Sequence, residues 1–141
     1  MVDVSDSPPV FIGMHITVAD LQATAEFYRR VGLPLPDSSG LGEHVEIDLG
    51  NGVHLALSTE FVARMYDPRW RRPSVPPGSA LQFRLGSRDA VDEMYAALTS
   101  AGYHGHLAPI DAFWGNRYAE VDDPDGTIVG FHSPTDPTHV S

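Results

Sequence analysis

Apolar and polar positions along the chain alternate in a pattern that predicts strands and amphipathic helices in a fixed order. Residues 14–18 are rich in β-formers, and Asp20 after them is a suitable helix N-cap. Apolar residues then recur at helical spacing until Gly32, a typical residue just beyond a helix end. We interpret the stripe as the buried face of a core helix: Leu21, Thr24, Phe27, Tyr28 and Val31.

The same order of elements occurs a second time, which indicates an internal repeat. Residues 81–85 read as a strand, Ser87 is the N-cap of the next helix and Gly102 ends it. Residues 45–52 and 119–126 also correspond, since each is an alternating strand that runs into an Asn-Gly or Asp-Gly turn. A further apolar strand follows each turn. Each copy thus reads as a strand, a helix and two or three further strands, and the sequence predicts two βαβββ units.

The Pro-rich segment between the copies marks the boundary of the units. Within it, residues 61–66 are expected to form a short helix, and the two chain ends are expected to be disordered. The predicted divisions are a disordered N-terminus 1–9, a first unit 10–60, a linker 61–78, a second unit 79–134 and a tail 135–141.

Composition narrows the function classes. The chain has 141 residues, a formal net charge of −10 and no cysteine. Phosphate backbones attract Lys and Arg clusters, so a nucleic-acid partner is not expected. The sequence has no apolar run of about 18 residues and no signal-peptide pattern, so no membrane partner is expected either. The lack of cysteine fits a cytoplasmic protein.

Four short motifs carry a resemblance to a known family. They are VADL at 18–21, EFY at 26–28, FWG at 113–115 and DPDG at 123–126. Together with the repeat, they resemble the glyoxalase/bleomycin-resistance/extradiol-dioxygenase superfamily, also called vicinal-oxygen-chelate proteins. The resemblance implies an α+β fold in which two βαβββ repeats form a curved mixed sheet, or cup, that holds a ligand. It also implies a homodimer.

In metal-dependent members, four cup positions carry His, Glu or Gln ligands. By motif spacing, these positions are Gly13, Ala56, Ala80 and Gly130 here. Neither Gly nor Ala has a side-chain lone pair, whereas zinc, iron and manganese sites need imidazole or carboxylate. The sequence therefore predicts no metal at these positions and no cofactor, and it predicts open volume at the centre of the cup.

The polar parity of the strands predicts which side chains face the cup, because side chains alternate between the faces of a sheet. Trp114 joins them from a loop expected at the rim, where it could stack on a planar ligand or instead pack into the core or dimer interface. The expected ligand-binding residues are His15, Glu46, His54, Gln82, Arg84, Trp114, Tyr118, Glu120 and His132.

Two of these assignments have alternatives. His15 and His54 lie two residues from the usual ligand positions, so a shifted metal site with Glu46 is chemically conceivable. Arg84 could hold an anionic ligand, but we favour an ion pair with Glu46 or Glu120, because a buried unpaired charge is costly.

Two functions follow. The first is metal-independent binding of a small planar or aromatic molecule, similar to the drug-binding members of the superfamily. The alternative is an enzyme: a metal-free or shifted-metal lyase, isomerase or dioxygenase in which cup histidines act as bases and glutamates orient them. The sequence contains no nucleophile-elbow or phosphate-loop motif that would point to another reaction class.

Overall fold

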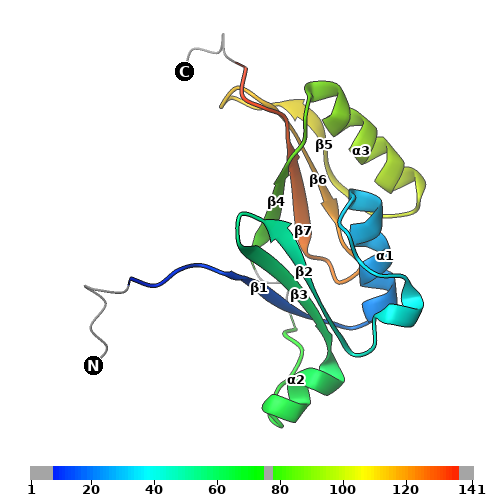
Figure 1. Ribbon diagram of the computed structural model, residues 1–141. Helices are drawn as coiled ribbons and strands as arrows, with labels where there is room; N and C mark the ends of the chain where they lie inside the picture. The colour runs from blue at the N-terminus through cyan, green and yellow to red at the C-terminus, as the bar shows by residue number, and fades with distance from the viewer. Residues whose placement is uncertain (1–7, 75–77, 137–141) are drawn as a thin grey trace. The chain divides into compact units, whose positions relative to one another are not determined.

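The computed structural model describes residues 8–74 and 78–136 (Figure 1). The chain divides into two compact units. The first comprises the chain up to Leu21 together with Leu33–Trp70, and the second comprises Gln22–Gly32 and the chain from Arg71 onward. The sequence predicts disorder at residues 1–9 and 135–141, and most of these residues lie outside the described part of the chain.

The first unit is built on a three-stranded sheet in the order β1-β3-β2. Strand β1 (Gly13–Val18) runs parallel to β3 (Val53–Thr59), and β2 (His44–Gly50) is antiparallel to β3. The β2–β3 turn has positive φ at Asn51 (56°) and Gly52 (76°), as a type I′ hairpin requires.

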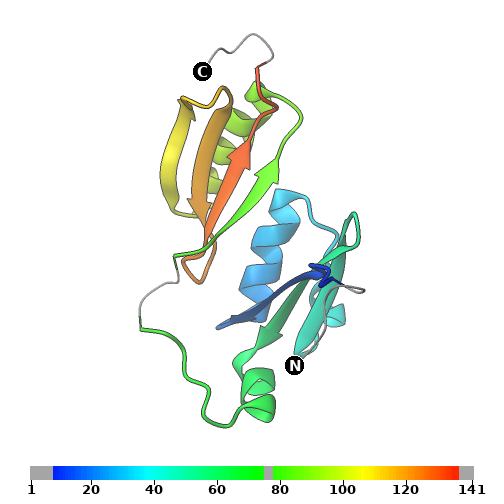
Figure 2. The ribbon, with the colours of Figure 1, turned by 90° about the vertical axis from the view of Figure 1, so that its left-hand side faces the viewer.

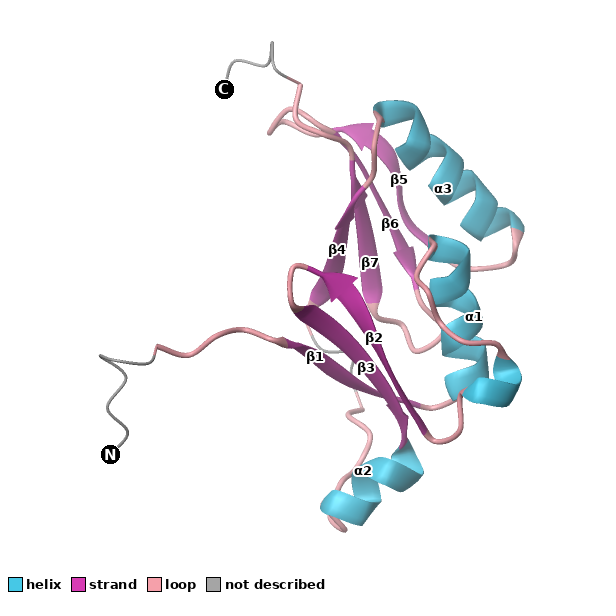
Figure 3. Ribbon diagram, viewed as in Figure 1, coloured by secondary structure: helices cyan, strands magenta, loops and turns pink. Residues whose placement is uncertain are grey.

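Helix α2 (Glu60–Tyr66) follows β3 directly, and it is the short helix that the sequence predicts. The hydroxyl of Thr59 accepts a hydrogen bond from the amide of Val62 at 3.4 Å and so caps its first turn. Helix α2 lies against β3 and β1 of the same unit (Figure 3).

In the first unit two strands follow the helix, which agrees with the two or three that the sequence predicts. The segment before β2 contains only the short 3-10 helix η1 (Ser38–Gly40). Pro34 and Pro36 in this segment have no amide hydrogen to donate to a sheet, which disfavours a strand there.

The second unit holds a four-stranded sheet in the order β4-β7-β6-β5 (Figure 2). The strands are β4 (Ala80–Arg84), β5 (Gly105–Asp111), β6 (Arg117–Asp122) and β7 (Ile128–His132). Helix α3 (Arg88–Ser100) covers one face of this sheet and contacts β5, β6 and β7. Ser87 caps α3 as predicted, because its hydroxyl accepts a hydrogen bond from the amide of Ala90 at 3.1 Å.

Helix α1 spans Leu21–Val31. Its first residue, Leu21, belongs to the first unit, and the rest of the helix, from Gln22 onward, belongs to the second unit. The ring of Phe27 packs edge-on against Tyr103 with centroids 4.9 Å apart. Phe27 and Tyr28 are completely buried. The helix that the sequence assigns to the first repeat therefore completes the core of the second unit.

Both sheets bury one parity of their strands. In the first unit the buried side chains include Val45, Ile47, Leu55 and Leu57, and in the second Val121, Val129 and Phe131. Residues of the opposite parity form a largely polar face in each unit. Among the described residues, no helix is both long enough and apolar enough to cross a lipid bilayer.

Candidate functional site

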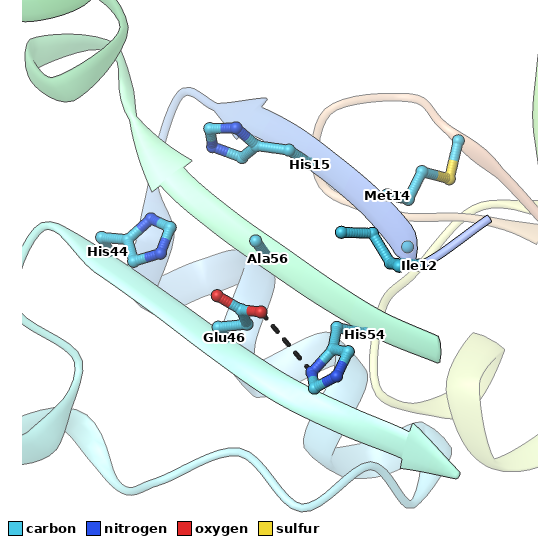
Figure 4. A pocket seen from close by; sticks show the side chains of 8 residues that line it. Ile12, Met14, His15, His44, Glu46, His54 and Ala56 are labelled. Carbon is cyan, nitrogen blue, oxygen red and sulfur yellow. Dashed lines mark ion pairs between the residues drawn. The ribbon is translucent and has the colours of Figure 1, made fainter. Parts of the chain in front are cut away.

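Strand register arranges the polar face of the first unit in rows across β1, β3 and β2. His15 and Glu46 flank Ala56, Thr17 and His44 flank Ser58, and Gly13 lies beside His54. Figure 4 shows His15, Ala56 and Glu46 on three adjacent strands, with Ala56 in the middle. Because Ala56 has the smallest side chain of its row, the sheet surface is lowest there.

A hollow of about 290 Å³ lies over this face. A second hollow of about 710 Å³ lies beside α2, and His15 and His44 line both of them. The first is lined by Ile12, Gly13, Met14, His15, His44, Glu46, His54 and Ala56, and the second by His15, His44, Val62, Ala63, Met65 and Tyr66. The two histidines therefore lie between the polar face of the sheet and the apolar side chains of α2.

The two imidazoles share one hydroxyl. Nε2 of His15 lies 2.7 Å from Oγ of Ser58, and Nδ1 of His44 lies 2.5 Å from the same oxygen. The rings meet edge-on with centroids 5.7 Å apart, and Ser58 is fully buried beneath them. A hydroxyl has a single hydrogen, so Ser58 can donate to one imidazole while it accepts from the other. The arrangement fixes both rings with respect to the sheet.

Glu46 and His54 form the second polar pair of the hollow. Oε1 of Glu46 lies 3.5 Å from Nδ1 of His54, as the dashed line in Figure 4 marks. Their side chains are 54% and 42% exposed, respectively. A carboxylate beside one ring nitrogen favours a hydrogen on that nitrogen and leaves the other free to act as an acceptor.

In the second unit, the structure brings together three of the residues that the sequence predicts to bind a ligand. The rings of Tyr118 and His132 have centroids 4.4 Å apart, and Trp114 lies 5.7 Å from Tyr118 and 6.4 Å from His132. Trp114 is 40% exposed, so this aromatic cluster offers one accessible ring edge. Trp114 neither projects freely for stacking nor lies fully in the core.

A chain of hydrogen bonds continues from the aromatic cluster. His132 Nε2 contacts Oε1 of Gln82, the amide nitrogen of Gln82 lies 3.5 Å from the Tyr118 hydroxyl, and that hydroxyl donates to Glu120 at 2.5 Å. Burial lowers the pKa of His132, partly offset by the charge of Glu120. Burial, and then the hydrogen bond to Glu120, raises the pKa of Tyr118. Both shifts favour the neutral forms of His132 and Tyr118.

Of the two ion pairs that the sequence favours for Arg84, the one with Glu120 does not form. The side chain of Arg84 is exposed, and within the described part of the second unit it forms no ion pair with Glu120. Glu120 instead accepts from Tyr118, and its other oxygen lies 3.9 Å from Nε2 of His106. Tyr118 is two residues from Glu120 on the same strand and face, so it reaches the carboxylate more readily than Arg84 on β4.

Sequence reasoning missed several residues of these surfaces. The alternation of β2 and β3 places His44 and Ser58 on the polar face, but only the register shows that they meet His15. The wall from α2 was not foreseen. The group of His104, His106 and Asp122 is a third set outside the predicted residues, although His-Gly-His at the start of a strand is a visible signal of two imidazoles on one face.

Comparison with known proteins decides the family. The sequence profile of the Glyoxalase/Bleomycin resistance protein/Dioxygenase superfamily matches residues 11–131. The chain belongs to this superfamily. A search among curated proteins gave no match.

Solved structures of superfamily proteins share the fold. A glyoxalase/bleomycin resistance protein/dioxygenase family enzyme from Burkholderia phytofirmans superposes with a TM-score of 0.74 at 17% identity, over 86% of this chain and 96% of that one. A glyoxalase-related enzyme from Fulvimarina pelagi gives 0.73 at 21% identity, over 95% and 96%. Lactoylglutathione lyase from Agrobacterium tumefaciens gives 0.63 at 21% identity, over 91% and 96%. At these identities, the likeness establishes the fold.

At the four positions that motif spacing assigns to the superfamily's metal ligands, the residues present do not fit a metal ion. Gly13 and Ala56 line the hollow of the first unit, and Ala80 and Gly130 lie on the polar face of the second, but none has a donor atom. A Cβ at Gly13 would stand 2.2 Å from the carbonyl oxygen of His54, and one at Gly130 would stand 2.7 Å from Gln82 and from Tyr118.

At two of these four positions, other atoms occupy the space that a side chain would take. At Gly13 the neighbouring backbone occupies the space of a side chain, and at Gly130 two side-chain tips do. The shifted site with His15, His54 and Glu46 is not assembled either. Among residues 8–74 and 78–136, the group of metal-binding side chains that does come together is His104, His106 and Asp122.

Proposed function

We propose that this superfamily member binds a small organic molecule with a planar or aromatic body in the hollow of its first unit, without a metal at the superfamily's ligand positions. The observation that carries the proposal is the junction of the two hollows at His15 and His44. Small-molecule sites are concave and mostly apolar, with a few fixed polar groups, and they measure roughly 300–1,000 Å³.

Fixed polar groups and adaptable apolar walls are both present in this unit. The shared hydroxyl of Ser58 holds the imidazoles of His15 and His44, so a ligand meets them without a large cost of ordering. On the α2 side, Val62, Met65 and Tyr66 supply apolar contact, and methionine adapts to irregular shapes. Glu46 adds a negative charge, which favours a ligand that carries a positive or hydrogen-bond-donating group.

An enzymatic function is the second candidate, and the Glu46–His54 pair favours it. A histidine oriented by a carboxylate is a common general base. Relatives in fold are named as enzymes, among them the lactoylglutathione lyase. Under this alternative, His54 removes a proton from a molecule bound in the same hollow. The two candidates therefore share a site and differ in whether the ligand is changed.

The test is a thermal-shift screen of planar aromatic acids, amines and polycyclic antibiotics, followed by calorimetry of the hits. At a hundredfold excess over Kd, a ligand of the folded state adds about 2.7 kcal/mol of stability. Mass spectrometry of the recovered ligand separates the candidates: an unchanged ligand supports binding, and a changed one supports catalysis. Absence of any hit across the panel would contradict the proposal.

Helix α2 offers a matched pair of variants for locating the ligand. Met65 and Phe61 are similarly exposed, at 66% and 63%, but only Met65 lines the hollow. Met65→Ser should weaken binding severalfold, and Phe61→Ser should not. Ser58→Ala, which releases both imidazoles, should weaken binding further. Equal effects of the two α2 variants would place the ligand elsewhere.

The proposal includes a homodimer in the cytoplasm. The absence of cysteine in the chain supports a reducing compartment. Val10, Phe11 and Ile12 are consecutive and 68–79% exposed, and such apolar surface is often covered by a second copy. Light scattering of the wild-type chain and of Phe11→Asp tests this part: a wild-type monomer would contradict it.

A further inference from the structure

Two histidines and an aspartate lie side by side at one end of the second unit's sheet. His104 precedes β5, His106 is its second residue, and Asp122 is the last residue of the neighbouring strand β6. The amide of Asp122 donates a hydrogen bond to the carbonyl oxygen of His104 at 2.9 Å, which fixes the two strands at this point. Residues far apart in the sequence are thus adjacent in the sheet.

Gly105 explains why both histidines face away from helix α3. A Cβ at Gly105 would stand 2.1 Å from the hydroxyl oxygen of Tyr95, a residue of α3, so this position faces the helix. Neighbouring positions of a strand face opposite sides. The imidazoles of His104 and His106 therefore lie on the polar face of the sheet, as does Asp122.

The separations of the possible donor atoms match a metal-ion site. One donor atom from each of the three side chains can be chosen so that all lie within 4.8 Å of one another. Nδ1 of His106 lies 3.3 Å from Oδ1 of Asp122. Two ligands bound tetrahedrally at about 2.0–2.1 Å are separated by roughly 3.3 Å. This pair already has the spacing of two corners of a tetrahedron.

Two further details support a bound cation at this place. Oδ1 of Asp122 is buried, and apart from the contact with His106 it accepts no hydrogen bond from the described residues, which is unusual for a carboxylate oxygen. On the other side of the imidazole of His106, Nε2 lies 3.9 Å from Oε1 of Glu120. Metal-bound histidines commonly present their second nitrogen to a carboxylate, which orients the ring.

We propose that His104, His106 and Asp122 bind a divalent transition-metal ion of the Zn²⁺ type, with Glu120 as the carboxylate that orients His106. Two imidazoles and one carboxylate suit zinc and its neighbours, whereas Mg²⁺ and Ca²⁺ prefer oxygen ligands. Three protein ligands leave at least one position for water or a small anionic ligand. The site belongs to the second unit alone and shares no residue with the superfamily's ligand positions.

Calorimetry of tag-free, chelator-treated protein with ZnCl₂ tests the site. We expect one equivalent of Zn²⁺ to bind, and MgCl₂ at the same concentration not to compete. Co²⁺ should give the visible absorption bands of a four-coordinate site. Failure to bind Zn²⁺ would overturn the proposal.

Variants show where the ion binds. His104→Ala, His106→Ala and Asp122→Asn should each weaken Zn²⁺ binding by tenfold or more, and Glu120→Gln by a smaller factor. Asp89→Asn, on the exposed first turn of α3, is the control for a lost negative charge and should leave binding unchanged. Melting of the metal-free variants at the wild-type temperature establishes that they are folded.

Two results would contradict the assignment. Retention of wild-type affinity in both His106→Ala and Asp122→Asn would show that the ion binds elsewhere. Loss of binding in His54→Ala, with His106→Ala unaffected, would place it in the first unit. In wild-type protein, Zn²⁺ should shift the NMR amide resonances of Gly105 and Asp122, a readout that does not depend on any mutation.

Discussion

The hydroxyl of Tyr28 donates a hydrogen bond to Oδ2 of Asp123 at 2.8 Å, in the core of the second unit. Tyr28 comes from α1, and Asp123 begins the DPDG turn between β6 and β7. The other carboxylate oxygen of Asp123 accepts the amides of Asp125 and Thr127, each at 2.9 Å. One buried carboxylate thus shapes the turn and attaches α1 to it.

Removal of the Tyr28 hydroxyl should destabilise the protein. In Tyr28→Phe, Oδ2 of the buried Asp123 loses its partner, and an unsatisfied buried group costs about 1–3 kcal/mol. Chemical denaturation of both proteins at neutral pH measures the difference. Tyr103→Phe, which removes a hydroxyl from a partly exposed neighbour of Phe27, is the control and should have less effect. An unchanged free energy of unfolding in Tyr28→Phe would contradict the role of this bond.

The pH dependence of stability should contain a contribution from Asp123. Burial raises the pKa of its carboxyl above the usual 3.8, although the hydrogen bonds from Tyr28 and the turn amides oppose the shift. Between the two values, the folded state holds more protons than the unfolded state, so this contribution to stability falls as pH rises through that window. Below the window the contribution is fully favourable.

Asp123→Asn removes this titration, so the variant should gain stability relative to the wild type as the pH rises above 3.8. Denaturation curves at several pH values measure the trend. The side-chain oxygen of asparagine can still accept hydrogen bonds from the amides of Asp125 and Thr127. The variant therefore differs from the wild type mainly in the charge at this position. A relative stability of the variant that falls with pH would show that the carboxyl pKa is lowered in the fold.

Restoration of a side chain at Gly13 should cost stability rather than rebuild a ligand position. The backbone of His54 stands where the Cβ would be, and the φ of +157° is unusual for an L-residue. Gly13→Ala should lower the free energy of unfolding by about 1–3 kcal/mol. Gly86→Ala is the matched control, since a Cβ there meets no atom within 4 Å. Equal melting temperatures of the two variants would contradict the crowding at Gly13.

His132 should titrate at lower pH than an exposed histidine. Burial lowers its pKa from 6.5, and the nearby charge of Glu120 partly offsets this. NMR titration of the His132 ring protons should therefore give a midpoint below 6.5, and Glu120→Gln should move it lower still. A midpoint above 6.5 would mean that the cluster with Tyr118 and Gln82 stabilises the imidazolium ion instead.

Short stretches of sequence determine much of the local structure. Asn51-Gly52 forms the predicted hairpin turn, Ser87 caps α3, and Gly32 follows α1 with a φ of 113°. Each is a matter of a few neighbouring residues, whose backbone preferences act in the same way in any fold. That two strands and not three follow the helix in the first unit also has a local reason, the prolines before β2.

The functional surfaces needed the tertiary structure. Alternation shows that His15, His44 and Ser58 share a face, but the register of three strands brings their polar atoms within hydrogen-bonding distance. Likewise, Asp122 lies beside His104 and His106 only because β5 pairs with β6. Alternation along a strand determines which face of the sheet a side chain lies on. A binding site also requires particular distances between side chains of different strands, and these depend on how the strands pair.

By itself, the sequence determined the repeated order of elements, the buried parity of the strands, the superfamily and the absence of donors at its ligand positions. These follow from periodicity and residue type, which act locally. The packing of α1 into the second unit, the backbone contact at Gly13 and the hollow beside α2 were decided by the tertiary structure. These features depend on how segments that are distant in the sequence pack against one another, and the local conformational preferences of residues do not determine that packing.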